Sequence, residues 1–257
     1  MPEGDTIYGA ARRIRAALVG AQITSVETPH ARFERDRWPE RLSGRAVHSV
    51  DSKGKHLFIR FEGDLTLHSH LRMNGWWGVY ERGRRWGKSP SRAWLVIRTP
   101  QHEVVQFGGP VLELMTDSRS RFDRRLASLG PDVLAADFDE RRFLELLRAD
   151  DQTRGIGDAL LDQRNVAGIG NMWKAEGCFL AGVSPWRRLD EVADDEALAV
   201  LRQLRPLMLA SAEGRRVPRR WVFDRAGLPC RRCGTPVRAR GQGDDNRTTY
   251  WCPSCQA

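Results

Sequence analysis

Four of the five cysteines stand in two Cys-x-x-Cys pairs near the C-terminus, and this spacing constrains the fold more than any other feature. The pairs are Cys230/Cys233 and Cys252/Cys255, with 18 residues between them. Four thiolates at this spacing complete the tetrahedral shell of a zinc ion and leave no open position for catalysis. We therefore predict one structural Zn²⁺ in a small C-terminal module. The fifth cysteine, Cys178, lies in an apolar stretch and is expected to be a buried small hydrophobic residue.

The charge of the chain points to an anionic partner. The 257 residues carry a formal net charge of +9 and give a sequence pI near 9.9, which favours nucleic acid first and a membrane surface second. No apolar run is long enough to span a membrane, and the N-terminus lacks the pattern of a secretory signal. We expect a cytoplasmic, nucleoid-associated protein that is a monomer and has no membrane partner.

Hydrophobic periodicity divides the chain into a β-rich half and a helical half. Apolar residues recur at helical spacing from Asp5 to Leu18, which predicts an amphipathic helix almost at the N-terminus. From Ala21 to Thr116, alternating segments separated by Gly and Asn turns predict an antiparallel sandwich or barrel. After a charged stretch and a Gly-Pro break, the patterns become helical up to the cysteines. The expected fold class is α+β, with segments 1–117, 118–136 (a linker), 137–227 and 228–257.

The stretch Asn165-Val-Ala-Gly-Ile-Gly-Asn171 predicts a glycine-containing turn between two helices, with Asn171 as the N-cap of the second. Amides exposed at such a helix start form an anion site that can seat a DNA phosphate. A tight connection between packed helices is the alternative.

Two further segments place unusual residues at turns. Asp51-Ser-Lys-Gly-Lys-His56 predicts a hairpin tip that presents Lys53 and Lys55, two of only four lysines in the chain. The loop Arg72-Met73-Asn74 places an apolar side chain between polar ones. Met73 is either a partly buried loop residue or a wedge that fills the gap left when a base is extruded from a duplex.

The N-terminus poses a similar choice. Removal of Met1 would leave the secondary amine of Pro2 next to the carboxylate of Glu3. Most termini are frayed tails without function. The helix predicted to follow can pin this end of the chain, which keeps open the alternative of a reactive site.

Taken together, these elements closely resemble the formamidopyrimidine-DNA glycosylase/endonuclease VIII family of base-excision repair enzymes. MPEG before a helix, SKGKHL, NVAGIGNMWKAE and CRRCG…NRTTYWCPSC occur in the order and spacing of that family, over essentially the whole chain. The resemblance implies an N-terminal β-sandwich, a helix-two-turn-helix domain and a zinc-finger hairpin. It also implies damaged DNA as the partner, duplex and also single-stranded.

The resemblance also implies a role for each matching residue. Pro2 would attack C1′ of the damaged nucleotide and form a Schiff base, and Glu3 would act as general acid and base during ring opening and elimination. Lys55 would bind phosphate and assist base loss. Asn171 and Arg247 would bind phosphate, and Arg72, Met73 and Asn74 would occupy the void in the duplex.

Two departures favour the endonuclease VIII branch, whose members mainly remove oxidised pyrimidines. The chain has Val105-Gln-Phe-Gly-Gly-Pro110 where the purine-specific branch has a second void-filling Arg-Phe pair, and the segment Ala212–Leu228 is short. The expected activity is excision of oxidised pyrimidines with β,δ lyase activity. The alternatives are a glycosylase for 8-oxoguanine and formamidopyrimidine, a catalytically silent damage sensor, and a zinc-ribbon factor that acts on RNA or protein.

Overall fold

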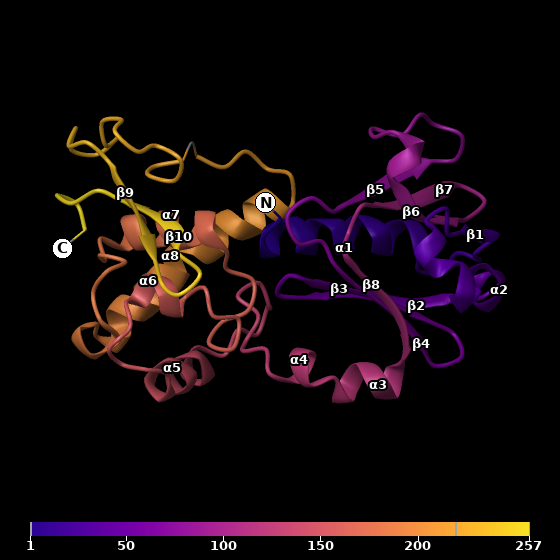
Figure 1. Ribbon diagram of the computed structural model, residues 1–257, viewed down its shortest axis with the longest axis horizontal. Coiled ribbons are helices and arrows are strands. Elements are labelled where there is room, and N and C mark those ends of the chain that lie inside the picture. The colour runs from indigo at the N-terminus through magenta and orange to yellow at the C-terminus, as the bar shows by residue number, and fades with distance from the viewer. Residues whose placement is uncertain (1, 219, 257) are drawn as a thin grey trace. The chain divides into compact units, whose positions relative to one another are not determined.

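The computed structural model describes residues 2–218 and 220–256, without the side chains of residues 32, 34 and 35. The chain folds into two compact units (Figure 1). The first unit holds Pro2 and residues 6–127, and the second holds residues 3–5 and 128–256. Within the described residues, no helix combines the length and the apolar character that a membrane span requires.

The first unit is a sandwich of two antiparallel sheets that follow one N-terminal helix. Helix α1 spans Gly4–Leu18. One sheet has the order β1 (Ser25–Glu27), β6 (Ala93–Arg98), β7 (His102–Phe107) and β5 (Trp76–Glu81). The other has the order β2 (Val47–Lys53), β3 (His56–Phe61), β4 (Leu65–His70) and β8 (Val111–Thr116). The predicted amphipathic helix and antiparallel sandwich are confirmed.

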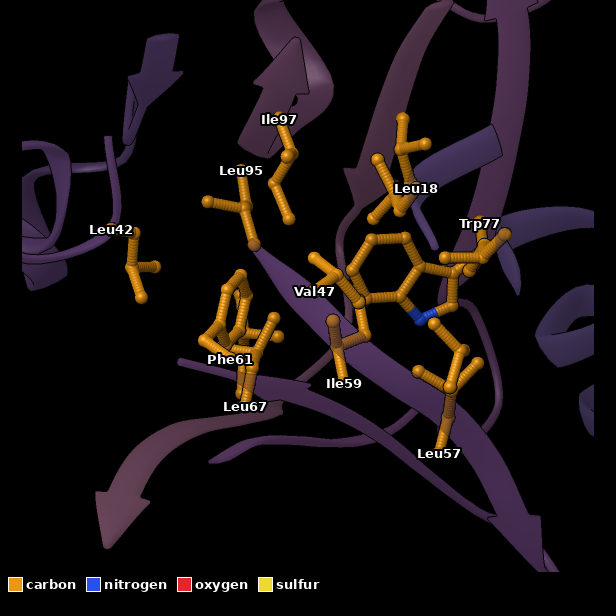
Figure 2. Close-up of a cluster of buried hydrophobic side chains, with 14 of the residues drawn as sticks. Leu18, Leu42, Val47, Leu57, Ile59, Phe61, Leu67, Trp77, Leu95 and Ile97 are labelled. Carbon is orange, nitrogen blue, oxygen red and sulfur yellow. The ribbon is translucent and has the colours of Figure 1, made fainter. Parts of the chain in front are cut away.

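The core of this unit lies between the two sheets and the apolar face of α1. Figure 2 shows the Trp77 ring of β5 among aliphatic side chains that include Leu18 of α1, Val47 of β2 and Leu57 of β3. The indole nitrogen of this buried residue donates to Ser69 Oγ at 3.2 Å, so the burial of the Trp77 ring leaves no polar atom unsatisfied. Burial of this one face fixes the strand register, because a slip by one residue would turn the apolar side chains outward.

Short helices flank the strands and were not predicted. Helix α2 (Trp38–Leu42) and the 3₁₀ helices η1 (Ala31–Asp36) and η2 (Pro90–Arg92) lie within the β-rich segment. The charged stretch that follows β8 forms α3 (Asp117–Phe122) and α4 (Arg124–Ala127). Each has at most six residues, too few for a clear hydrophobic period.

The second unit is helical and ends in a hairpin. Its helices are α5 (Glu140–Ala149), α6 (Ile156–Ala159), α7 (Asn171–Ala181), the 3₁₀ helix η3 (Leu189–Glu191) and α8 (Asp194–Ala212). The hairpin pairs β9 (Arg238–Gln242) with β10 (Arg247–Trp251). Helices α7 and α8 pack closely at Gly177, where a Cβ would lie 2.6 Å from Leu204 Cδ1. The expected α+β fold class is confirmed.

One buried carboxylate fixes the segment that precedes the cysteines. Glu176 of α7 is 5% exposed. It accepts hydrogen bonds from the backbone N–H groups of Trp221, Val222 and Phe223 at 2.7–3.0 Å. Ala175 and Phe179 of the same helix share a core with Val222, Val237, Cys230 and Cys252. Helix α7 is therefore the element on which the C-terminal module is built.

The first unit contains a cluster of buried and partly buried histidines whose protonation should destabilise it in acid. Burial, with the neighbouring His70 and His68, lowers the pKa of His56 to about 3. The unfolded chain takes up this proton near pH 6.5, so the free energy of unfolding should fall as pH drops from about 6.5 toward 3. His56→Gln should make this acid loss shallower, as measured by denaturant unfolding at a series of pH values.

His48→Gln is the matched control, because His48 is exposed on the neighbouring strand β2. This variant should keep the steepness of the original protein. Parallel pH curves for His56→Gln and the unaltered chain would contradict the assignment.

Candidate active site and metal site

Glu3 is buried, and its carboxylate is bound by the start of helix α7. The side chain is 3% exposed. Its oxygens accept hydrogen bonds from the backbone N–H groups of Gly170, Met172 and Trp173 at 3.1, 2.9 and 3.2 Å. These amides have no partner within the helix, and the positive end of the helix dipole favours a carboxylate there. The carboxylate is thus held in one position by three donors.

This arrangement corrects two expectations for the glycine turn. Helix α7 begins at Asn171, and its N-cap is Gly170 rather than Asn171. The amides expected to seat a phosphate serve Glu3 instead. The carboxylate of Glu3 caps the helix, so the N-cap position needs a small residue and not a polar one. A Cβ on Gly170 would lie 2.2 Å from Glu3 Cδ.

The residues after Glu3 are also bound. The Gly4 N–H donates to the carbonyl of Gly168 at 2.9 Å, and Ser211 Oγ of α8 donates to Asp5 Oδ2 at 2.6 Å. Backbone and side-chain bonds therefore fix Glu3–Asp5, which excludes a frayed tail at these residues. Met1, whose removal was expected, lies outside the described residues.

Pro2 lines a pocket of about 460 Å³ in the first unit, together with Thr6, Met73, Asn74, Gly75, Trp76, Lys88 and Arg92. Two predicted void-filling residues thus share a pocket with the predicted nucleophile. Met73 is 63% exposed, so it is not a buried residue of its loop. The loop turns sharply at Arg72, which has a φ of 51°. The backbone N–H of Arg72 donates to His70 Nδ1 at 3.2 Å.

Lys55 stands at the predicted hairpin tip, after Gly54 with a φ of 58°, and does not line the Pro2 pocket. The residue that follows it begins a chain of imidazoles. His56 Nδ1 lies 2.8 Å from His68 Nε2, and His68 Nδ1 lies 3.3 Å from Glu113 Oε2. Burial and the charges of Arg72 and Lys55 lower the pKa of His70, which packs against His56, to about 4. Neutral imidazoles therefore support the segments that carry Lys55 and Arg72.

Asn171 and the strand of Arg247 are joined within the second unit. Asn171 Nδ2 donates to the carbonyl of Thr248 at 2.8 Å, so the residue after Arg247 is bonded to the first residue of α7. The Arg247 guanidinium is partly exposed and pairs with Asp245 at 3.0 Å. The two predicted phosphate ligands are thus attached to adjoining backbone.

A buried lysine also links helix α7 to the hairpin. Lys174 is fully buried and donates to Thr249 Oγ1 of β10. The Thr249 hydroxyl donates to Gln242 Oε1 of β9 at 2.8 Å. Burial lowers the pKa of Lys174 to about 8. This contact fixes the hairpin on α7 at the strand that carries Arg247.

The four predicted cysteine ligands converge on one point. All four sulfur atoms lie within 4.8 Å of one another. Cys230 Sγ is 3.9 Å from Cys255 Sγ, and Cys233 Sγ is 3.5 Å from Cys252 Sγ. A tetrahedral zinc site with Zn–S bonds of about 2.3 Å requires sulfur atoms about 3.8 Å apart, whereas a disulfide requires about 2.05 Å. The residues therefore fit a structural zinc-type site. Cys178 is buried in α7, as predicted.

Sequence reasoning missed several neighbours of these residues. Trp76, Lys88 and Arg92 come from a strand and a loop beyond the Met73 turn, and no local pattern joins them to Pro2. His68 and His70 are two apart on β4, which places both on one face of the strand. That alternation was a usable signal for the imidazole cluster.

Models of three protein families match successive parts of the chain. The N-terminal domain of formamidopyrimidine-DNA glycosylase matches residues 1–125, its H2TH domain matches residues 129–217, and a zinc finger found in this glycosylase and in isoleucyl-tRNA synthetase matches residues 227–257.

Curated relatives are similar to the chain over nearly their full length. The chain is 43% identical to a probable endonuclease 8 2 of Streptomyces coelicolor, over 100% of this chain and 94% of that protein. It is 36% identical to a DNA-(apurinic or apyrimidinic site) lyase of Mycolicibacterium smegmatis, over 100% and 99%. A Lactococcus lactis formamidopyrimidine-DNA glycosylase bound to DNA with an abasic site has the same fold, with a TM-score of 0.82, 24% identity and 99% coverage of both chains.

These matches cover both units and the cysteine module, and the relatives over 30% identical carry endonuclease 8 and lyase names. The chain therefore belongs to the formamidopyrimidine-DNA glycosylase/endonuclease VIII family of bifunctional DNA glycosylases and AP lyases, on its endonuclease VIII branch.

Proposed function

We propose that this enzyme excises oxidised pyrimidines from DNA and then cleaves the strand through a Schiff base on Pro2. The observation that carries the proposal is the bound carboxylate of Glu3, one residue after a proline that lines a pocket with Met73 and Asn74. A secondary amine with a fixed carboxylate beside it supplies a nucleophile and a proton carrier.

The proposed chemistry uses an amine that is partly unprotonated at neutral pH. An α-amine titrates near pH 7.7–8.0 in model peptides, so an appreciable fraction carries a free electron pair. The electron pair of the Pro2 nitrogen forms a bond to C1′, and the bond from C1′ to the base breaks. The base leaves with the electrons of that broken bond and gains a proton. The attached Pro2 nitrogen passes its own proton to the Glu3 carboxylate, which delivers it to the ring oxygen as the bond from C1′ to that oxygen breaks and the sugar opens to the iminium. Glu3 then removes a C2′ proton as the bond from C3′ to its phosphate breaks, and a second elimination completes the β,δ sequence.

Other residues hold the DNA in this proposal. Lys55 binds phosphate and assists base loss. Asn171 and Arg247 bind a second phosphate, for which the guanidinium exchanges Asp245 for the DNA. Arg72, Met73 and Asn74 fill the space of the extruded nucleotide, and the exposure of Met73 supports this role.

The preference for pyrimidines rests on the chain's own segments and on its relatives. The purine-specific Arg-Phe pair is missing from 105–110, the segment 212–228 is short, and similar chains carry the name endonuclease 8. Excision of oxidised purines is the second candidate, favoured by the structural likeness to a formamidopyrimidine-DNA glycosylase.

Borohydride trapping on duplexes that contain thymine glycol, dihydrouracil or 8-oxoguanine tests this function. We expect a covalent protein–DNA product with both pyrimidine lesions, formed at least about tenfold faster than with 8-oxoguanine. An N-terminal tag converts the Pro2 amine into an amide, so the tagged protein should form no product. The same protein after tag removal down to Pro2 is the matched control.

Each alternative predicts a different trapping result. A reversed lesion preference would place the enzyme with the purine-specific glycosylases. DNA binding without a trapped product on any lesion, in the untagged protein, would mean a silent sensor.

We further propose that the metal held by the cysteines is zinc. Cys252→Ser should reduce the zinc content from about one ion per chain to near zero. It should lower the melting temperature by about 5 °C or more, because the metal stabilises the fold of the module. DNA affinity should fall as well, since the hairpin carries Arg247.

Cys178→Ala is the matched control, because it removes a buried thiol of α7 outside the cluster. It should keep the full zinc content. Metal-free protein with unchanged stability and DNA affinity would refute the zinc assignment.

A further inference from the structure

Strand β5 places one tryptophan in the core and the next one at the surface. Adjacent residues of a strand point to opposite faces. Trp77 is 2% exposed, whereas Trp76 is 41% exposed at the first position of this edge strand. Trp76 and Met73, two of the few large exposed apolar side chains of the described residues, both line the Pro2 pocket. Exposed apolar surface gathered at one place is typical of a binding site.

The loop between β5 and β6 is fastened to the sheet, and this positions Lys88. Trp86 Nε1 donates to Glu103 Oε2 of β7 at 2.7 Å, and the Gly87 N–H donates to the Tyr80 hydroxyl at 3.1 Å. The Tyr80 ring packs directly against Gly78, because any Cβ at that position would lie only 2.4 Å from Tyr80 Cε2. The residue after Gly87 is Lys88.

Lys88 places its charge over the exposed ring. Its Nζ lies 5.7 Å from the centroid of the Trp76 ring, within the range of a cation–π contact. Arg92, at the end of the same loop, also lines the pocket. The pocket thus combines the aromatic plane of Trp76 with two cations beside Pro2. None of these three side chains has a catalytic role in the proposed function.

An aromatic plane flanked by cations matches the chemistry of a nucleotide. Bases stack on aromatic side chains regardless of sequence, and the phosphates beside them are neutralised by lysine and arginine. An apolar peptide would leave these cations unmatched.

We propose that Trp76 and Lys88 form a stacking site for an unpaired base of the DNA strand that enters the Pro2 pocket, with Lys88 and Arg92 on the adjoining phosphates. This inference takes one point from the proposed function, namely that the ligand is DNA. It assigns Trp76 to binding and not to the chemical step.

Binding of a short unmodified oligothymidylate, measured by fluorescence anisotropy, tests the site without any chemistry. Trp76→Ala should weaken binding about tenfold, the typical loss of one stacked base. Trp76→Phe keeps an aromatic face and should stay within about threefold of the unaltered protein. Lys88→Gln should reduce the slope of log K against log salt by about 0.7, the value for one phosphate contact on a single strand.

Phe122→Ala is the matched control, because Phe122 is 80% exposed on α3 and does not line the pocket. It should bind the oligothymidylate like the unaltered protein. Trapping of an abasic duplex by each variant separates this site from the proposed function. If the Trp76 and Lys88 variants lose binding as predicted but the unaltered protein traps no DNA, the proposed function is overturned and the stacking site stands.

Three outcomes would overturn the stacking site. Unchanged binding by Trp76→Ala is the first, and equal losses in Trp76→Phe and Trp76→Ala at equal melting temperatures is the second. The third is an unchanged slope of log K against log salt in Lys88→Gln. Lys88 is partly exposed, so this test holds even if the tryptophan variants fail to fold.

Discussion

The carboxylate of Glu3, bound by three backbone amides at the start of α7, is the contact on which the rest of the second unit's site depends. The helix start is polar and lacks its own capping side chain, and the carboxylate supplies the missing acceptor. Capping an internal helix with the third residue of the chain fixes the peptide that joins Glu3 to Pro2. A helix terminus that other proteins use to bind phosphate is thereby used to bind the carboxylate of Glu3.

Helix α7 carries more than this contact. Glu176 binds the backbone of 221–223, Lys174 binds Thr249, and Asn171 binds the carbonyl of Thr248. The backbone amides at the start of this helix therefore fix the carboxylate of Glu3, and its side chains fix the segment before the cysteines and the strand of Arg247. A structural metal held by the four cysteines would stabilise the same strand from its other end, so a site without an open coordination position would still serve DNA binding.

The sequence predicted the features that have a local period or spacing. The amphipathic residues of α1, the alternation in β3 and β4 and the four cysteines each encode their structure within a short stretch. The capping of α7 was predicted wrongly, because the acceptor for Gly170 lies 167 residues away and the pattern around Asn171 contains no sign of it. The pocket of Trp76, Lys88 and Pro2 was missed for the same reason. It depends on a loop fastened by Trp86 and Glu103, a contact between positions 17 residues apart.

Peptide mapping of the borohydride-reduced protein–DNA product tests the central claim most directly, because it identifies the nitrogen that attacks the sugar. The account predicts a single modified peptide, the N-terminal one, with the deoxyribose remnant on Pro2. The chain has only four lysines, at positions 53, 55, 88 and 174, so every competing amine falls in an identifiable peptide. A remnant on Lys55, or on any other lysine, with an unmodified N-terminal peptide would contradict the account.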